Sequence, residues 1–183
     1  MADIDTKKIL VIVTNYGIEQ DELTVPVAEL QGAGAQVTVA AVEKAAIETL
    51  VGDKDPGQSV AADVALEDVD ARDYDALLVP GGTINADTLR TNTDATALVT
   101  AFASAGKVVA AICHGPWVLL EAGVLGGKTL TSYESVATDI KNAGGSWVDQ
   151  AVKVCSCEGW TLVTSRTPDD LDAFVPAIVE ALS

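Results

Sequence analysis

Cys113 is the residue of this sequence best placed for covalent chemistry. It follows the apolar run VVAAI at residues 108–112, which predicts a buried parallel strand, and Gly115 and Pro116 then open an apolar helix over residues 117–122. Cys113 therefore falls on a strand-to-helix turn, the place where α/β hydrolases present their nucleophile. Unpaired N–H groups and the positive end of the helix favour the thiolate there. Cys113 could instead be a core residue, because cysteine is often buried. The pattern C-H-G-P at a strand-to-helix turn favours the role of nucleophile for Cys113.

Glu19 is the candidate carboxyl partner of Cys113. It follows the apolar run at residues 8–14. Ligands of open α/β sheets bind beyond the carboxyl ends of the strands, so Glu19 and Cys113 are expected to meet in one crevice. A carboxyl beside a thiol can hold or move a proton when burial raises its pKa. A purely structural role is also open, because Glu19, Asp21 and Glu22 all lie at a predicted helix N-terminus, where carboxylates are stabilising in any protein.

Two glycines, Gly81 and Gly82, follow the apolar strand predicted at residues 75–80 and are expected in the same crevice. Glycine at this position lets a substrate approach the main chain. The backbone N–H groups of Gly82 and His114 are the expected donors to an oxyanion. Trp117 and Tyr133 could line the crevice, although aromatic residues more often belong to a core or its rim.

His114 is the only histidine of the chain. An amidotransferase triad needs a histidine distant from its cysteine, so glutamine hydrolysis by that mechanism is excluded. One histidine with Cys155 and Cys157 supplies too few ligands for zinc, and no metal site is predicted. Cys155 and Cys157 form a C-x-C on a predicted strand, where both would share one face and either pack or lie exposed near an edge. A resolving role toward oxidised Cys113 is a further hypothesis.

The elements that must position these residues alternate along the chain. Apolar runs predict strands at residues 8–14, 36–42, 75–80, 108–112, 129–131, 151–155 and 161–165, with helices near 21–31, 94–105 and 135–143. A last helix is predicted to start at Thr167. The Thr167 side chain can accept a hydrogen bond from the Asp170 N–H, while the Asp170 side chain accepts one from the Thr167 N–H. The turn-rich residues 53–57 between runs at 48–51 and 59–64 predict a β-hairpin insertion. This pattern predicts one flavodoxin-like α/β domain over residues 1–183, a three-layer sandwich whose mostly parallel sheet has helices on both faces.

The charge balance excludes several classes of partner. With 11 Lys and Arg against 27 Asp and Glu, the net charge is −16, which repels nucleic acid and anionic lipid unless a nucleotide is small or locally exposed. The acidic N-terminus MADID and the short first apolar run do not resemble a secretory signal or a membrane span, so a reducing cytoplasm is the simplest location. Residues 123–129 imitate a phosphate loop without its spacing, and no dinucleotide fingerprint occurs, so no cofactor is predicted.

Four stretches together resemble the PfpI family of the DJ/PfpI superfamily, relatives of the type 1 glutamine amidotransferases. They are AICHGP at residues 111–116, PGG at 80–82, GIEQDEL at 17–23 and TSRTPDDL at 164–171, and the resemblance extends from Lys8 to Leu182. It implies that Glu19 is the acidic partner of Cys113. It also implies a triad of Cys113, His114 and an acid from a neighbouring subunit. The best match for that acid is Asp87, although Ala86 stands where the family often has Pro, and Asp87 where it has Glu; a surface helix cap is its other reading.

The resemblance implies a cysteine-dependent stress-response enzyme that needs no cofactor. Its expected substrates are reactive carbonyls or glycated adducts of proteins, handled by glyoxalase-like or deglycase-like chemistry, and the expected assembly is a homodimer or hexamer. One alternative is an intracellular cysteine peptidase that uses Cys113, His114 and Asp87. The other is a redox sensor or holdase chaperone that uses Cys113 as a reactive thiol without catalysis.

Overall fold

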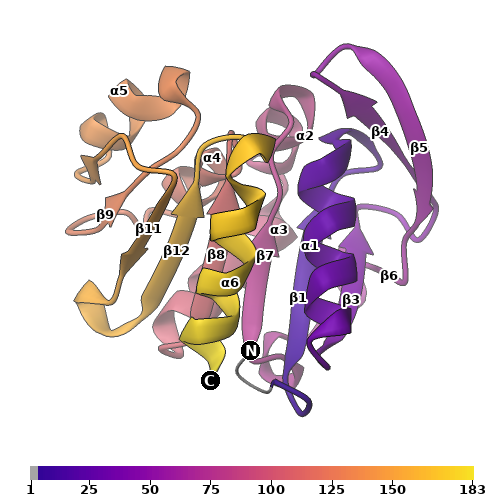
Figure 1. Cartoon of the computed structure of the whole chain (residues 1–183), viewed down its shortest axis with the longest axis horizontal. Coiled ribbons are helices and arrows are strands. Elements are labelled where there is room, and N and C mark those ends of the chain that lie inside the picture. The colour runs from indigo at the N-terminus through magenta and orange to yellow at the C-terminus, as the bar shows by residue number, and fades with distance from the viewer. Residues whose placement is uncertain (1–3) are drawn as a thin grey trace.

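A seven-stranded, mostly parallel sheet forms the centre of the chain in a computed structural model, which describes residues 4–183 (Figure 1). Residues 1–3, part of the acidic N-terminal stretch, lie outside the described residues. Only β11, at one edge, runs antiparallel to its neighbour β12. In spatial order the strands are β11 (Val152–Cys155), β12 (Thr161–Ser165), β8 (Val108–Ile112), β7 (Ala76–Val79), β1 (Lys8–Val13), β3 (Gln36–Ala41) and β6 (Val64–Ala65). The predicted mixed α/β fold is confirmed.

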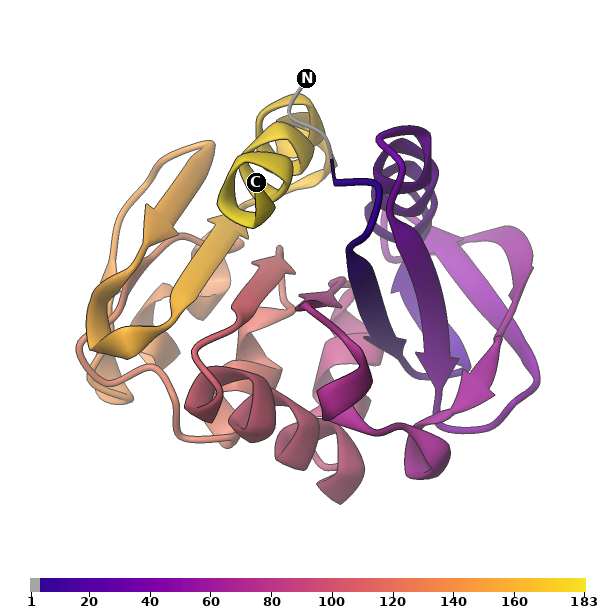
Figure 2. The same ribbon diagram turned by 90° about the horizontal axis from the view of Figure 1, so that it is seen from below.

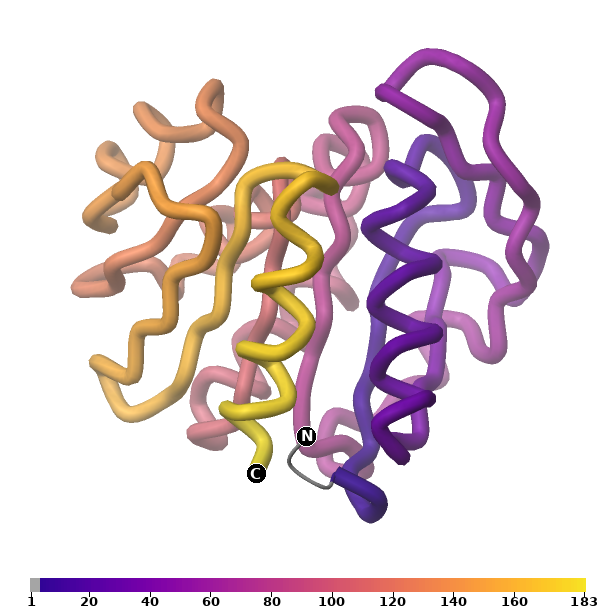
Figure 3. Tube along the Cα trace, in the orientation of Figure 1, coloured from indigo at the N-terminus to yellow at the C-terminus, as the bar shows by residue number. Residues whose placement is uncertain are grey.

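Helices cover both faces of this sheet, as Figure 2 shows. The alternation of side chains along β1 creates the two interfaces: Ile9 and Val11 belong to one core, Leu10 and Ile12 to the other. The first core includes α1 (Gln20–Gly32) and α6 (Leu171–Leu182), and the second includes α3 (Thr93–Ser104) and α4 (Pro116–Glu121). Figure 3 shows that α1 and α6, from opposite ends of the chain, lie side by side on one face.

The predicted hairpin is present, but it belongs to a second sheet that the sequence did not indicate. Its strands β4 (Ala46–Val51) and β5 (Asp55–Ala61) are antiparallel, and β2 (Tyr16–Glu19) pairs in parallel with β4. The turn lies at residues 52–54 instead of 53–57. No element was predicted between the strand at residues 8–14 and the helix near 21–31, but residues 16–19 form the extended strand β2.

Several shorter elements complete the chain. They are α2 (Thr83–Leu89), which was not predicted, α5 (Ala137–Asn142), β9 (Thr129–Leu130), β10 (Ser146–Trp147), and the 3₁₀ turns η1 (Leu66–Asp68), η2 (Ala71–Asp73), η3 (Glu134–Val136), η4 (Cys157–Gly159) and η5 (Pro168–Asp170). The predicted capping pair was wrong: Thr167 makes no side-chain cap, and the carboxylate of Asp170 instead accepts hydrogen bonds from Arg166. None of the helices within residues 4–183 has the length and apolar character needed to cross a bilayer.

Candidate active site

Cys113 occupies a strained turn between β8 and α4. Its backbone φ is +60°, a left-handed conformation that a non-glycine residue adopts only at a cost of about 1–3 kcal/mol. The Cys113 N–H donates to Ser165 O at 3.1 Å, and Gly115 N–H donates to Ile112 O at 2.8 Å, so backbone hydrogen bonds hold both sides of the turn. Cys113 as a whole residue is 4% exposed. The predicted strand-to-helix placement of this residue is confirmed.

Glu22, and not Glu19, is the carboxyl beside Cys113. Glu22 is fully buried, its Oε2 accepts the Gly81 N–H at 2.8 Å, and its carboxyl and the Cys113 thiol perturb each other's pKa by direct interaction. The other oxygen, Oε1, is buried and receives no hydrogen bond within residues 4–183. A carboxylate oxygen in that state would be costly, whereas a protonated carboxyl has one proton to donate. The environment therefore favours the neutral acid.

Glu19 has a different task, which corrects its expected placement. Its two oxygens accept the N–H groups of Gly52, at 3.0 Å, and Asp53, at 2.9 Å. The reason is the extra strand β2: Glu19 is its last residue, directly before α1 begins at Gln20, and the Glu19 side chain reaches the tip of the β4–β5 hairpin. Asp53 then accepts the N–H and hydroxyl of Thr83 at the start of α2. Glu19 thus ties the hairpin tip to the ends of β2 and α2.

The sequence did contain a signal for Glu22. The buried face of α1 consists of Glu22, Leu23, Pro26 and Leu30, in which Glu22, Pro26 and Leu30 follow a four-residue spacing. A carboxyl within the apolar stripe of a helix must be buried, while Asp21 beside it points to solvent. Reading the periodicity of α1 through its first turn would have selected Glu22.

Burial dominates the protonation of this pair. Loss of water raises the pKa of Glu22 to about 8, although hydrogen bonds with the Gly81 N–H and the Cys113 thiol lower it. Burial also raises the pKa of the Cys113 thiol, and the negative charge of ionised Glu22 raises it further; the N–H groups of Gly82 and His114 act in the opposite direction. When Glu22 is protonated, its charge no longer opposes the thiolate. The neutral acid is therefore the form of Glu22 that activates the sulfur.

His114 lies closer to the thiol than two adjacent residues usually allow. Its Nδ1 is 3.1 Å from Cys113 Sγ, and its Nε2 is 3.3 Å from Ser135 Oγ. The imidazole stacks on Tyr133, with ring centroids 4.6 Å apart, and lies 5.0 Å from the ring of Trp117. Burial lowers the pKa of His114, so the ring is neutral near pH 7. A neutral imidazole against the sulfur can accept or return a proton.

The two glycines close the other side of the thiol. A Cβ on Gly81 would stand 2.5 Å from Glu22 Oε2 and 2.8 Å from Cys113 Cβ, so only glycine fits between the carboxyl and the cysteine. Gly82 has φ +83° and is the N-cap residue of α2, and its N–H, like that of His114, lowers the pKa of the Cys113 thiol. These two N–H groups therefore favour negative charge at the sulfur.

Asp87 does not join this constellation within one chain. It lies exposed on α2, and no hydrogen bond or ion pair within residues 4–183 connects it with His114 or Cys113. The predicted triad through Asp87 is therefore not formed within one chain. A contribution of Asp87 from a neighbouring subunit stays a prediction.

Cys155 and Cys157 lie far from this site. Cys155 ends β11, but Cys157 lies exposed in η4, so the expectation that both share one face of a strand was wrong. Cys155 pairs with Leu162 of β12, and Leu162 pairs with Val109 of β8. Val109 lies four residues before Cys113, so the two cysteines are at least about 13 Å apart along the strand direction. That distance argues against a resolving role. No group of three potential metal-binding side chains (His, Cys, Asp or Glu) occurs in the described part of the chain.

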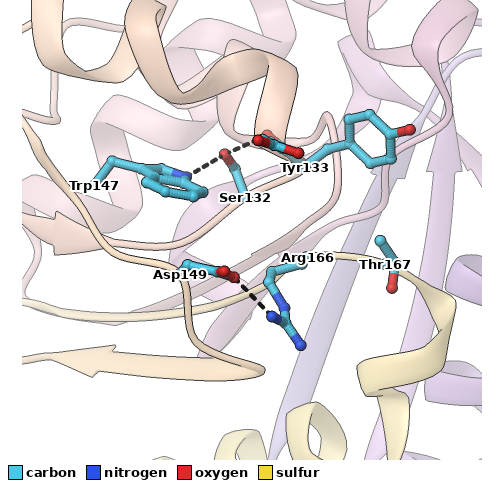
Figure 4. A pocket seen from close by; sticks show the side chains of 7 residues that line it. Ser132, Tyr133, Trp147, Asp149, Arg166 and Thr167 are labelled. Carbon is cyan, nitrogen blue, oxygen red and sulfur yellow. Dashed lines mark hydrogen bonds and ion pairs between the residues drawn. The ribbon is translucent and has the colours of Figure 1, made fainter.

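A pocket of about 340 Å³ lies beside the end of β12, and Cys113 is not among its lining residues (Figure 4). Its lining includes Ser132, Tyr133, Glu134, Trp147, Asp149, Arg166 and Thr167. It is tied to the nucleophile through the backbone, because Tyr133 N–H donates to Cys113 O at 2.9 Å and Arg166 follows Ser165, which holds the Cys113 N–H. Tyr133 thus lines this pocket, whereas the indole N–H of Trp117 donates to Asp139.

Comparison with known proteins identifies relatives along almost the whole chain. The family model described as DJ-1/PfpI matches residues 7–181. The chain is 42% identical to General stress protein 18 of Bacillus subtilis over 92% of this chain and 93% of that protein. It is 43% identical to "Putative cysteine protease YraA" of B. subtilis and 41% identical to Protein/nucleic acid deglycase 2 of Escherichia coli, each over 92% of this chain and 94% of the relative.

Solved structures show the same architecture. Drosophila melanogaster DJ-1beta superposes with a TM-score of 0.84 and 33% identity, over 96% of this chain and 90% of that one. The sheet with helices on both faces is therefore shared with DJ-1 proteins, and the sequence match covers the turn that carries Cys113 and the helix that carries Glu22. The chain belongs to the DJ-1/PfpI family.

Proposed function

We propose that this protein is a cysteine-dependent enzyme that converts reactive carbonyl compounds and their early adducts without a cofactor. The observation that carries the proposal is the Cys113–Glu22 pair: a buried thiol in a strained turn, next to a buried carboxyl whose pKa is about 8. Such a carboxyl is protonated near pH 7 and can both give and take a proton there, as general acid–base catalysis requires.

A mechanism for methylglyoxal follows from these contacts. The Cys113 sulfur adds to the aldehyde carbon to give a hemithioacetal, and the N–H groups of Gly82 and His114 stabilise the oxyanion. Protonated Glu22 first gives its proton to the oxyanion, and the carboxylate so formed takes the proton of this carbon and returns it to the neighbouring carbonyl carbon. The first carbon is thereby oxidised to a thioester and the second is reduced to an alcohol. Water hydrolyses the thioester, which releases lactate and returns the thiol. His114 Nδ1, 3.1 Å from the sulfur, accepts and returns the thiol proton.

The names of relatives support an enzyme that acts on glycated material. The E. coli relative is named a protein/nucleic acid deglycase, and a Thermococcus kodakarensis relative a deglycase. The first name is in tension with the exclusion of nucleic acid on the basis of net charge. A charge of −16 disfavours a long duplex, whereas an exposed glycated nucleotide presents little phosphate to the site.

A peptidase is the second candidate, favoured by the close contact of His114 Nδ1 with Cys113 Sγ. In one chain, however, His114 Nε2 faces the Ser135 hydroxyl instead of a carboxylate. A triad through Asp87 would need a second subunit to bring that side chain to His114. Peptidase activity that persists in a monomeric preparation would therefore exclude the Asp87 triad.

The proposed function is tested by lactate formation from methylglyoxal in metal-free buffer. Wild type is expected to turn over, Cys113→Ser to lose at least about 10³-fold in kcat, and the matched control Cys155→Ser to retain wild-type activity. Absence of lactate with the wild type would refute carbonyl chemistry and favour the peptidase or the redox sensor. Equal activity of Cys113→Ser and wild type would remove Cys113 from the mechanism.

A further inference from the structure

Cys155 and Cys157 are in side-chain contact at the turn that joins β11 to β12. Cys155 is the last residue of β11 and is 6% exposed, whereas Cys157 is exposed in η4. The Cys157 N–H and thiol both donate hydrogen bonds to the Cys155 sulfur. In an extended strand, residues two apart are separated by about 6.6 Å, near the upper limit for a disulfide. Ser156 has φ −100° and ψ 17°, a bend that brings the two cysteines closer together.

The surroundings of the Cys155 sulfur favour the thiolate. Strand β9 lies beside β11 (Figure 1), and the Thr129 N–H of β9 donates to Cys155 Sγ at 3.4 Å. Lys128, the residue before Thr129, adds a positive charge near both sulfurs. Burial alone would raise the pKa of Cys155, but these N–H groups, the Cys157 thiol and the charge of Lys128 lower it below the ordinary 9.0. The hydrogen bond to Cys155 and the negative charge of that sulfur raise the pKa of Cys157, so the pair loses its first proton at Cys155.

Lys128 is held in place by the same turn. The residue is 0% exposed, and its Nζ donates to Cys157 O and to Trp160 O, the second at 2.7 Å. The Nζ also lies 3.8 Å from the centroid of the Trp160 ring. No carboxylate within residues 4–183 forms an ion pair with Lys128. Burial lowers the pKa of Lys128 and the charge of the Cys155 sulfur raises it, so each group stabilises the charged form of the other.

We propose that Cys155 and Cys157 form a second thiol site, separate from Cys113, at which hydrogen peroxide converts the dithiol to a disulfide within one chain. The Cys155 thiolate attacks the O–O bond and becomes a sulfenic acid, and the released hydroxide takes a proton from solvent and leaves as water. The Cys157 sulfur then attacks the Cys155 sulfur. The S–S bond forms, and the hydroxide that is displaced leaves as water with the Cys157 proton. Two thiols and one peroxide thus give one disulfide and two waters.

The exposure of the two cysteines fits this division of roles. Cys155 is almost buried, so the oxidant that reaches it must be small, and hydrogen peroxide is little larger than water. Cys157 is exposed, so a thiol reductant can reach its sulfur in the disulfide and reverse the reaction. The site is independent of the proposed function, because neither step uses Cys113.

Peroxide oxidation of the Cys113→Ser protein tests this site, because only the two thiols of the pair remain. After treatment, the protein is denatured, labelled with a maleimide, digested with trypsin and analysed by mass spectrometry. Both thiols should be lost together, and the peptide of residues 154–166 should be unlabelled and lighter by two hydrogen atoms. Dithiothreitol should restore both thiols.

Two variants in the same background separate the roles. With Cys157→Ser, Cys155 should react but proceed to sulfinic acid, which dithiothreitol does not reverse. With Cys155→Ser, Cys157 should react at least about tenfold more slowly than the pair, because its sulfur lacks the contacts that favour a thiolate.

Lys128→Gln supplies a further readout. Removal of the charge should slow the loss of the two thiols at least about fivefold. Since this variant also loses hydrogen bonds to the turn, the cysteine variants, which keep Lys128, decide the outcome. The proposal would be overturned by two thiols that stay free under conditions that fully oxidise N-acetylcysteine, by equal reaction rates of the Cys155→Ser and Cys157→Ser proteins, or by a disulfide that joins two chains on a non-reducing gel.

Discussion

Glu22→Gln is expected to lower kcat for methylglyoxal by about 10²–10⁴-fold, the usual contribution of a positioned acid–base group. The amide keeps the size of the side chain and can still accept the Gly81 N–H, but it cannot transfer a proton between adjacent carbons. The pH dependence should change as well. Wild-type activity should fall as the pH rises through about 8, because ionised Glu22 then opposes the Cys113 thiolate; the variant should lose this step. The profile of kcat against pH, from 6 to about 9.5, measures both effects.

Glu19→Gln is the matched control for this experiment. Glu19 contacts the N–H groups of Gly52 and Asp53 and not the thiol, so its variant should retain most of the activity. An equal loss in the Glu19 and Glu22 variants would contradict the assignment of the proton transfer to Glu22.

Glu22→Gln is also expected to stabilise the fold at alkaline pH, with a gain that grows with pH. The ordinary pKa of a glutamate is 4.5, and burial raises that of Glu22 to about 8, so between these values the native state binds more protons than the unfolded state. The free energy of unfolding of the wild type therefore falls as the pH rises through this window, by up to about 1.4 kcal/mol per pH unit, and the loss is complete above about pH 8. The total is on the order of a few kcal/mol.

Urea unfolding of the wild type and Glu22→Gln at pH 5, 7 and 9 measures this difference. Comparing the two proteins at each pH removes the contributions of groups common to both. One of these is His114, whose lowered pKa makes the fold lose stability as the pH falls below about 6.5. A constant difference between the two proteins at all three pH values would show that Glu22 does not titrate in this window.

The sequence predicts those parts of the site that depend on one element. Cys113 could be placed because the uninterrupted apolar strand at residues 108–112 is followed closely by Gly115 and Pro116. Glycine and proline at this spacing favour a turn that opens a helix. Gly81 and Gly82 could be placed for the same reason at the end of β7. The alternation of strands and helices predicts parallel strands, and the carboxyl ends of parallel strands lie at one edge of the sheet.

The choice between Glu19 and Glu22 depends on an element that the sequence shows only weakly. Four residues, YGIE at 16–19, form β2, and this strand is stabilised by pairing with β4, which lies almost thirty residues later in the chain. Local propensity does not report such a long-range contact. Glu19 and Glu22 are only three residues apart, but their surroundings differ. The Glu19 carboxyl accepts hydrogen bonds from backbone N–H groups of the hairpin tip, whereas the Glu22 carboxyl is buried beside the Cys113 thiol. The short helix α2 escaped prediction because its position depends on the contact of Asp53 with Thr83.

The protonation state of Glu22 is the most direct test of this account. In protein labelled with carbon-13 at the glutamate carboxyl, the resonance that disappears in Glu22→Gln identifies the residue, and its chemical shift can be followed from pH 4 to about pH 10. The expected result is a neutral carboxyl at pH 6 that titrates near pH 8. A carboxylate already ionised at pH 6, with a midpoint near the ordinary 4.5, would contradict the pairing of a neutral acid with Cys113.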